Sequence, residues 1–186
     1  MNAVNRNIER SIAAYQRNDW EDAFKQIAHA IDGLAKLRKP KGGVGERIRK
    51  FVDSYENFFI RIAVPGLFGG SGTVKIQYGI GDKTYDFSQA FYSYIRNPTS
   101  HGDEFHEFVE FRTGNQIGTA GNKLTVTPGH LIAFILICVS CPENQNGNLP
   151  SDPSIKIEIL KNSFTVRLNE YFGKHDELVK FLKLYE

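Results

Sequence analysis

Arg96, Asn97 and His101 are close enough in the sequence to act together in phosphate chemistry. Arginine offers a permanent positive charge with planar donors that suit phosphate oxygens, and histidine exchanges a proton near neutral pH. This pairing fits phosphodiester cleavage better than acyl transfer. We expect His101 to act as the general base, Arg96 to stabilise developing negative charge, and Asn97 to orient rather than react.

Pro98 predicts a helix break that turns Arg96 and His101 toward one point. Proline disfavours the helical conformation at the residue before it, so the first helix should end near Arg96. Asn97 as N-cap and Pro98 at the first helical position would then begin a second helix that extends to about Glu110. The open amides of this helix start would favour an anion beside His101.

The spacing of Arg96, Asn97 and His101 resembles the RNxxxH signature of the HEPN superfamily (higher eukaryotes and prokaryotes nucleotide-binding). The resemblance implies a helical bundle, frequent homodimers and, in many members, metal-independent RNA cleavage at a site shared by two copies of the motif. It covers residues 44–141 best and does not account for residues 150–186. Toxin-like members are usually neutralised by a partner, so an antitoxin-like protein is also implied.

Two functions follow as expectations. The first is a ribonuclease that cuts single-stranded RNA without metal or cofactor, as the toxin of a toxin–antitoxin or defence system. The second is a catalytically inactive module that binds a nucleotide or a protein through the same residues. In a third, purely structural interpretation, Arg96 pairs with a carboxylate such as Glu104 and His101 only packs.

The residues after the motif allow two interpretations of their own. They include several metal-ligand types close together, and His106 and Glu110 would share a helix face. The more ordinary interpretation is a solvated acidic turn that complements a helix start. The residues concerned are His101, Asp103, His106, Glu107 and Glu110.

A basic stretch from Lys36 to Lys50 predicts a flexible connection between two helices. It holds seven Lys or Arg and one acid. A solvated loop would explain this composition, and so would a patch that steers phosphates toward the motif. The predicted substrate-binding residues are Lys36, Arg38, Lys39, Lys41 and Arg47.

The composition is that of a soluble globular domain. Of the 186 residues, 41% are hydrophobic and 24% charged, and the formal net charge of +2 is too small to identify a nucleic-acid binder. The N-terminus lacks the apolar core of a secretory signal, and the longest apolar run, Leu131 to Val139, is too short to span a membrane. We therefore expect a cytoplasmic protein without a membrane partner, in which Cys138 and Cys141 are buried hydrophobes.

Hydrophobic periodicity predicts a mainly α fold with small β-hairpin additions near residues 108–126 and 155–168. The length fits a single domain over residues 1–186, and the resemblance implies that this domain is HEPN-like. Residues 150–186 form a hairpin-plus-helix extension in this prediction. Expected helices cover about residues 8–17, 19–37, 48–62, 86–96, 97–110, 127–141 and 176–184. Three of their starts are indicated by Asp19 as an N-cap, by Asp86 with Gln89 three residues later, and by Thr127 followed by Pro128. Val74 to Tyr78 predicts a short strand or extended connector.

Overall fold

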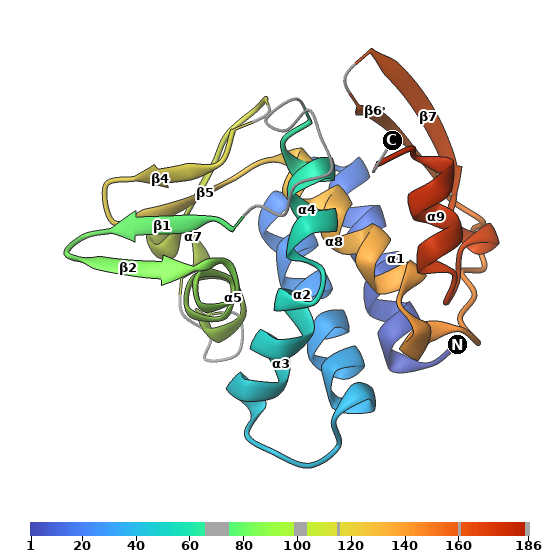
Figure 1. The fold of residues 1–186 in the computed structure, drawn as a ribbon, viewed down its shortest axis with the longest axis horizontal. Coiled ribbons are helices and arrows are strands. Elements are labelled where there is room, and N and C mark those ends of the chain that lie inside the picture. The colour runs from blue at the N-terminus through green and yellow to red at the C-terminus, as the bar shows by residue number, and fades with distance from the viewer. Residues whose placement is uncertain (66–74, 99–103, 115, 160, 185–186) are drawn as a thin grey trace.

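The computed structural model describes residues 1–65, 75–98, 104–114, 116–159 and 161–184. In it 55% of the residues are helical, with several small sheets of two or three strands. The predicted mainly α class with small β additions is therefore confirmed. Figure 1 shows helices gathered around α8 (Pro128–Ser140), with the sheets on two sides of them.

The first two helices pack against each other. They are α1 (Ala3–Gln16) and α2 (Trp20–Arg38). The Asp19 carboxylate accepts a hydrogen bond from the Asp22 amide at 3.1 Å, so the predicted N-cap of α2 is confirmed. A buried hydrogen bond also joins the two helices, from the Ser11 hydroxyl to the Ala23 carbonyl at 2.8 Å.

The predicted single helix over residues 48–62 is wrong, because the chain forms two helices there. They are α3 (Val44–Asp53) and α4 (Glu56–Ala63). At the break the Ser54 hydroxyl donates to the Phe51 carbonyl at 2.7 Å, a local bond that competes with the helical ladder. Tyr55 then has φ −116° and ψ 8°, outside the helical region.

Helix α8 is buried almost all round, as its apolar sequence predicts, and it begins after Thr127 as the cap-plus-proline pattern indicates. Gly129 permits the close approach of α4, because a Cβ there would lie 2.7 Å from the Ala63 carbonyl oxygen. The aromatic core is built on this helix. The Phe134 ring centroid lies 4.7 Å from that of Phe59 and 4.8 Å from that of Phe91.

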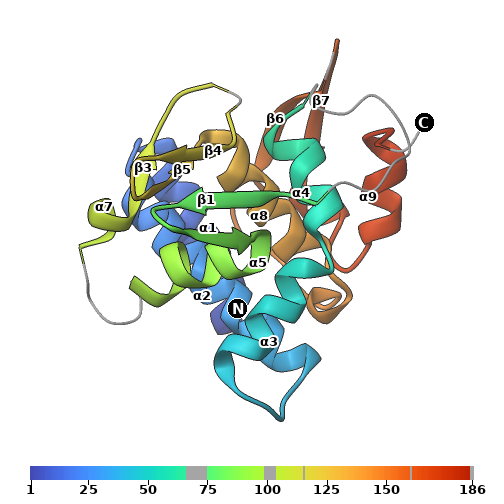
Figure 2. The same cartoon turned by 60° about the vertical axis from the view of Figure 1, so that its left-hand side comes forward.

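Two small sheets lie beside each other on one side of α8 (Figure 2). The hairpin of β1 (Gln77–Ile80) and β2 (Lys83–Asp86) replaces the single strand predicted around Tyr78, and Val74 lies outside the described residues. The second sheet has the order β3-β5-β4. Its strands are β3 (Val109–Phe111), β4 (Gly118–Ala120) and β5 (Lys123–Val126).

The predicted hairpin near residues 108–126 is confirmed in β4 and β5, which pair antiparallel. Strand β3 pairs parallel to β5, which the sequence did not predict. This pairing also corrects the helix predicted over residues 97–110. Only α7 (Phe105–Phe108) is helical after the undescribed residues 99–103, and the strand begins at Val109.

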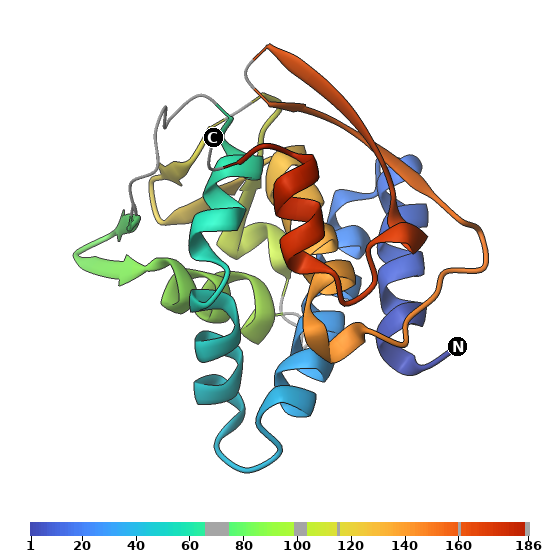
Figure 3. The same cartoon turned by 45° about the vertical axis from the view of Figure 1, so that its right-hand side comes forward.

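The C-terminal hairpin and helix are confirmed. They are β6 (Ser154–Ile159) with β7 (Asn162–Arg167) and α9 (His175–Phe181), which ends earlier than predicted. One 3₁₀ turn, η2 (Pro142–Asn144), precedes the hairpin, and another, η3 (Leu168–Glu170), lies between β7 and α9. Figure 3 shows α9 alongside α4 and α8, and buried residues from Val4 to Leu184 form one hydrophobic cluster.

Candidate functional site

The motif is carried by a helix that changes its winding. It begins as α5 (Phe87–Ala90), where Asp86 and Gln89 form the predicted capping box, and continues as the π-helical segment η1 (Phe91–Arg96). The Asn97 amide closes the segment with a hydrogen bond to the Tyr92 carbonyl, five residues back. π-helical turns are rare and occur often at functional sites.

The predicted helix break at Arg96 and Asn97 is wrong. Asn97 has φ −65° and ψ −48°, so it lies inside the helix rather than capping a new one, and Pro98 is also helical. Proline is accommodated because the π segment before it has already left the i→i−4 ladder whose bond proline removes. His101 lies outside the described residues, so its approach to Arg96 stays a prediction.

Arg96 is held by a carboxylate from another helix. Its Nη2 donates to Oδ2 of Asp32 on α2 at 2.8 Å, with 16% of the Arg96 side chain and 26% of the Asp32 side chain exposed. A carboxylate partner was expected in the structural interpretation, but Glu104 was the wrong choice. Glu104 instead lies 3.1 Å from His106, and both side chains are exposed.

The predicted phosphate-steering residues occupy three kinds of surroundings. Lys36 and Lys41 are exposed. The Lys39 ammonium donates to Glu46 at 2.7 Å, and Arg47 Nη1 donates to the Gly42 carbonyl at 2.8 Å. Hydrogen bonds from Lys39 and Lys50 lower the pKa of Glu46 to about 2. These contacts fix the connection between α2 and α3 locally.

All three nitrogens of the Arg38 guanidinium donate hydrogen bonds to other side chains of the fold. Its Nε donates to Glu143 at 2.6 Å, Nη1 donates to the Ser54 hydroxyl at 2.6 Å, and Nη2 donates to the Tyr55 hydroxyl at 2.7 Å. The guanidinium carbon also lies 4.6 Å from the Phe51 ring centroid. Burial acts to raise the pKa of Glu143, but the hydrogen bonds that the carboxylate accepts and the charge of Arg38 together outweigh burial, so the pKa is lowered. We call these five residues the Arg38 anchor.

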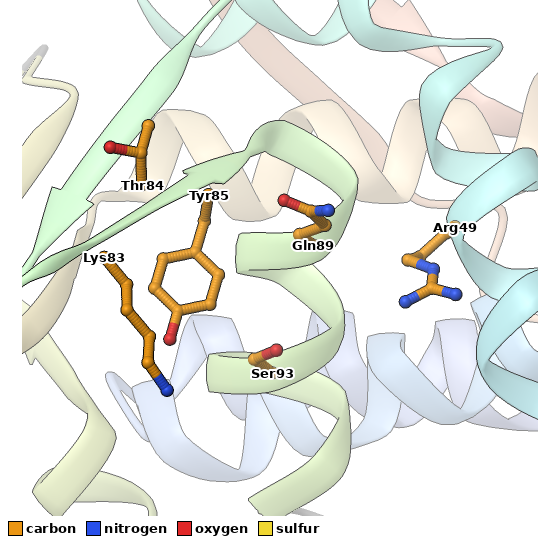
Figure 4. Close-up of a pocket in the computed structure, with 6 residues that line it drawn as sticks. All are labelled: Arg49, Lys83, Thr84, Tyr85, Gln89 and Ser93. Atoms are coloured by element: carbon orange, nitrogen blue, oxygen red, sulfur yellow. The ribbon is translucent and has the colours of Figure 1, made fainter.

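A groove of about 390 Å³ lies between α3, β2 and the motif helix (Figure 4). None of its lining residues was predicted as a site residue. Arg49 belongs to the basic stretch but was not singled out, and Lys83 and Tyr85 come from a strand that the sequence analysis did not predict. Its lining consists of Arg49, Lys83, Thr84, Tyr85, Gln89 and Ser93. We call this site the polar groove.

Tyr92 connects the polar groove to the motif. The guanidinium carbons of Arg49 and Arg96 each lie 5.9 Å from the Tyr92 ring centroid. Gly45 lets α3 approach this ring, since a Cβ there would lie 3.0 Å from Tyr92 Cζ. Arg49 in the groove and Arg96 in the motif therefore both lie beside the Tyr92 ring.

His130 and His175 have structural positions. The Thr127 amide donates to Nδ1 of His130 at 3.2 Å, and complete burial lowers the pKa of His130 to about 3. His175 Nδ1 lies 2.9 Å from the Ser140 hydroxyl. Burial lowers the pKa of His175, and the charge of Arg38 lowers it further.

Cys138 and Cys141 are both buried and unbonded to each other, as free thiols. Burial raises the pKa of Cys141 to about 12, which keeps the thiol protonated. Among the described residues no three metal-ligand side chains lie together, but His101 and Asp103 fall outside them. None of the described helices is both long and apolar enough to cross a membrane.

The model of the Rv1289 family matches residues 3–186 of the chain. The chain belongs to the Rv1289 family. No curated protein and no solved structure matches it. In this Rv1289-family chain the features that bear on function are the motif helix, the polar groove and the Arg96–Asp32 pair.

Proposed function

We propose that the chain is a HEPN-like endoribonuclease that cuts single-stranded RNA without a metal ion. The position of Arg96 carries the proposal. Its partly buried guanidinium lies at the end of a π-helical segment, held by Asp32, and a groove with two further cations is next to it across Tyr92. Fixed cations near a phosphodiester are what transition-state stabilisation requires.

In the proposed reaction His101 removes the proton from an RNA 2′-hydroxyl, and the 2′-oxygen attacks the adjacent phosphorus. Arg96 stabilises the charge on the non-bridging oxygens, and Asp32 keeps its guanidinium oriented. The bond to the 5′-oxygen breaks, and that oxygen takes a proton from a general acid. The products are a 2′,3′-cyclic phosphate and a free 5′-hydroxyl.

The general acid is expected from a second copy of the chain. One histidine cannot readily act as base and acid in the same displacement, whereas a two-fold dimer that brings two motif segments together supplies both. A homodimer is therefore part of the proposal. An antitoxin-like protein that covers this shared site is the partner the HEPN resemblance suggests.

A catalytically inactive module is the second candidate, and the Arg96–Asp32 ion pair favours it. A guanidinium already matched to a carboxylate at 2.8 Å must share or give up that bond to hold a phosphate. In this candidate the Arg96–Asp32 pair holds the motif helix against α2. The chain then binds a nucleotide or a protein without turnover.

The test uses labelled single-stranded RNA in EDTA. The unmodified chain is expected to cut it and to leave 2′,3′-cyclic phosphate ends, and His101→Ala is expected to be inactive. His106→Ala is the matched control, because His106 is an exposed histidine close to the motif and belongs to the metal interpretation. Stable binding of RNA with no cutting by the unmodified chain would establish the second candidate instead.

A further inference from the structure

The polar groove is positively charged and has no acidic residue in its lining. Arg49 and Lys83 contribute charge from α3 and β2, and the other lining side chains are neutral. Within the described part of the chain neither cationic side chain has an ion pair or a hydrogen bond, and the Arg49 guanidinium carbon lies 5.9 Å from the Tyr92 ring centroid. A groove lined in this way is suited to an anionic ligand.

Among the described residues, the carboxylate at the start of the motif helix forms no ion pair with Arg49 or Lys83. Asp86 accepts hydrogen bonds from the Gln89 amide at 2.7 Å and from the Ser88 hydroxyl at 2.9 Å, so it caps the helix. In return the Asp86 amide donates to Oε1 of Gln89 at 3.0 Å. This bond fixes the Gln89 amide and leaves its Nε2 as a donor in the groove.

An aromatic ring completes the groove. Tyr85 is half-buried, and its ring packs edge-on against Tyr94, with centroids 5.3 Å apart and planes at 88°. Figure 4 shows this ring between Lys83 and the helix that carries Gln89 and Ser93. Cations beside an aromatic ring and fixed amide donors together suit a nucleobase with its phosphates.

We infer that the polar groove binds nucleotides of the single-stranded RNA that flank the scissile bond. Arg49 and Lys83 neutralise phosphates, and Tyr85 stacks on a base. The inference rests on the proposed function for the identity of the ligand. A strand fits better than a free mononucleotide because Arg49, Lys83, Thr84 and Gln89 are all exposed, so a small ligand would be little buried.

The groove also lies on the path to the motif. Because Tyr92 contacts both Arg49 and Arg96, a strand that passes over this ring connects the two sites. The groove thereby supplies affinity and register, while bond cleavage stays with the motif residues. Arg49 and Lys83 are binding residues in this assignment and do not touch the reacting atoms.

The test measures binding of a labelled 2′-O-methyl RNA, which lacks the nucleophile and cannot be cut. Arg49→Ala with Lys83→Ala is expected to raise the Kd roughly 10- to 30-fold at 0.1 M salt and to reduce the slope of log K against log salt by about 1.4, since each phosphate contact on a single strand contributes about 0.7. Tyr85→Ala is expected to raise the Kd roughly 5- to 150-fold, and Tyr85→Phe to retain binding.

Lys156→Ala is the control for loss of an exposed cation elsewhere on the surface. Lys156 is exposed on β6, on the side of the molecule away from β2, so its removal should leave both Kd and slope unchanged. Unchanged Kd and slope in the Arg49→Ala/Lys83→Ala double variant would overturn the inference. AMP that competes as effectively as an RNA strand of equal nucleotide concentration would overturn the choice of a strand.

The outcomes separate this inference from the proposed function. If the unmodified chain binds 2′-O-methyl RNA through the groove but never cuts ordinary RNA, the nuclease proposal fails and the groove stands. If the chain cuts RNA and the double variant cuts subsaturating RNA at the same rate, the groove fails and the nuclease stands. Matching thermal unfolding midpoints for the variants show that folding is intact.

Discussion

Arg38 and Arg49 belong to the same basic stretch, but their guanidinium groups meet different surroundings. Arg38 donates to Glu143, Ser54 and Tyr55, and therefore ties the end of α2 to the break between α3 and α4 and to η2. Arg49 has no such acceptor among the described residues and lines the polar groove. A basic stretch thus divides into cations that stabilise the fold and cations that can bind a ligand.

Arg96 lies between these two cases. Like Arg38 it is paired with a carboxylate among the described residues, here Asp32, and it shares Tyr92 with Arg49, which lines the polar groove. Whether Arg96 acts on the fold or on a ligand is therefore the sharpest question that the comparison raises.

The largest expected effect tests Arg96 directly. Arg96→Ala should lower the rate of RNA cutting by about 10²- to 10³-fold, because transition-state charge stabilisation is lost. The chain should stay folded, with a modest drop in the unfolding midpoint because Asp32 loses its partner. The measurement is single-turnover cleavage in EDTA beside thermal unfolding, with Arg17→Ala as an exposed-arginine control. An unfolded Arg96→Ala chain would place Arg96 with the Arg38 anchor.

The next largest effect concerns stability. Arg38→Ala should lower the free energy of unfolding by about 2–3 kcal/mol, since it leaves Glu143 without its partner and removes donors to two hydroxyl groups. Urea unfolding measures this loss. Arg38→Lys keeps the charge but not the fork of donors, so it should recover only part of it. A chain as stable as the unmodified one would end the contrast with Arg49.

A third effect separates the core from the groove by pH. The folded pKa of His130 is lowered to about 3, so its contribution to stability is present above the unfolded pKa of about 6.5 and is lost as the pH falls toward 3. Between pH 6 and pH 5 this loss is about 1.2 kcal/mol. Between pH 6 and pH 5 the free energy of unfolding of His130→Gln should therefore fall by about 1.2 kcal/mol less than that of the unmodified chain.

The control for the pH measurement is His29→Gln, because His29 is exposed and its removal should leave the pH dependence unchanged. His130→Gln should leave the affinity for 2′-O-methyl RNA unchanged, because His130 is buried and does not line the polar groove. Equal pH dependence of stability in the unmodified chain and in His130→Gln would show that another group is responsible.

The smallest effect concerns Glu46, which accepts hydrogen bonds from Lys39 and Lys50 on the surface. Glu46→Gln should leave the unfolding midpoint unchanged, because exposed ion pairs contribute little. It should raise the affinity for RNA roughly twofold at low salt, because a negative charge near the groove is removed. A clear loss of stability would mean that the surface pairs also anchor the fold.

Local patterns in the sequence determined most helices and the C-terminal hairpin. The N-cap at Asp19, the capping box at Asp86 and the cap-plus-proline start of α8 depend on residues a few positions apart, and all three are confirmed. Strand alternation in β6 and β7 is equally local. The motif residues themselves were also visible in the sequence, as a set of chemical types at a fixed spacing.

Only the tertiary structure decided how those residues are used. The helical conformation of Asn97 depends on the π segment before it, and no local rule for proline predicts that winding. Arg96 is paired with Asp32, which lies on α2 and is far from it in the sequence. The polar groove brings Arg49 on α3 together with residues of β2, although α4 and β1 separate the two in the sequence. Sequence spacing shows which chemistry is available, whereas packing decides which charges are paired within the fold and which remain open to a ligand.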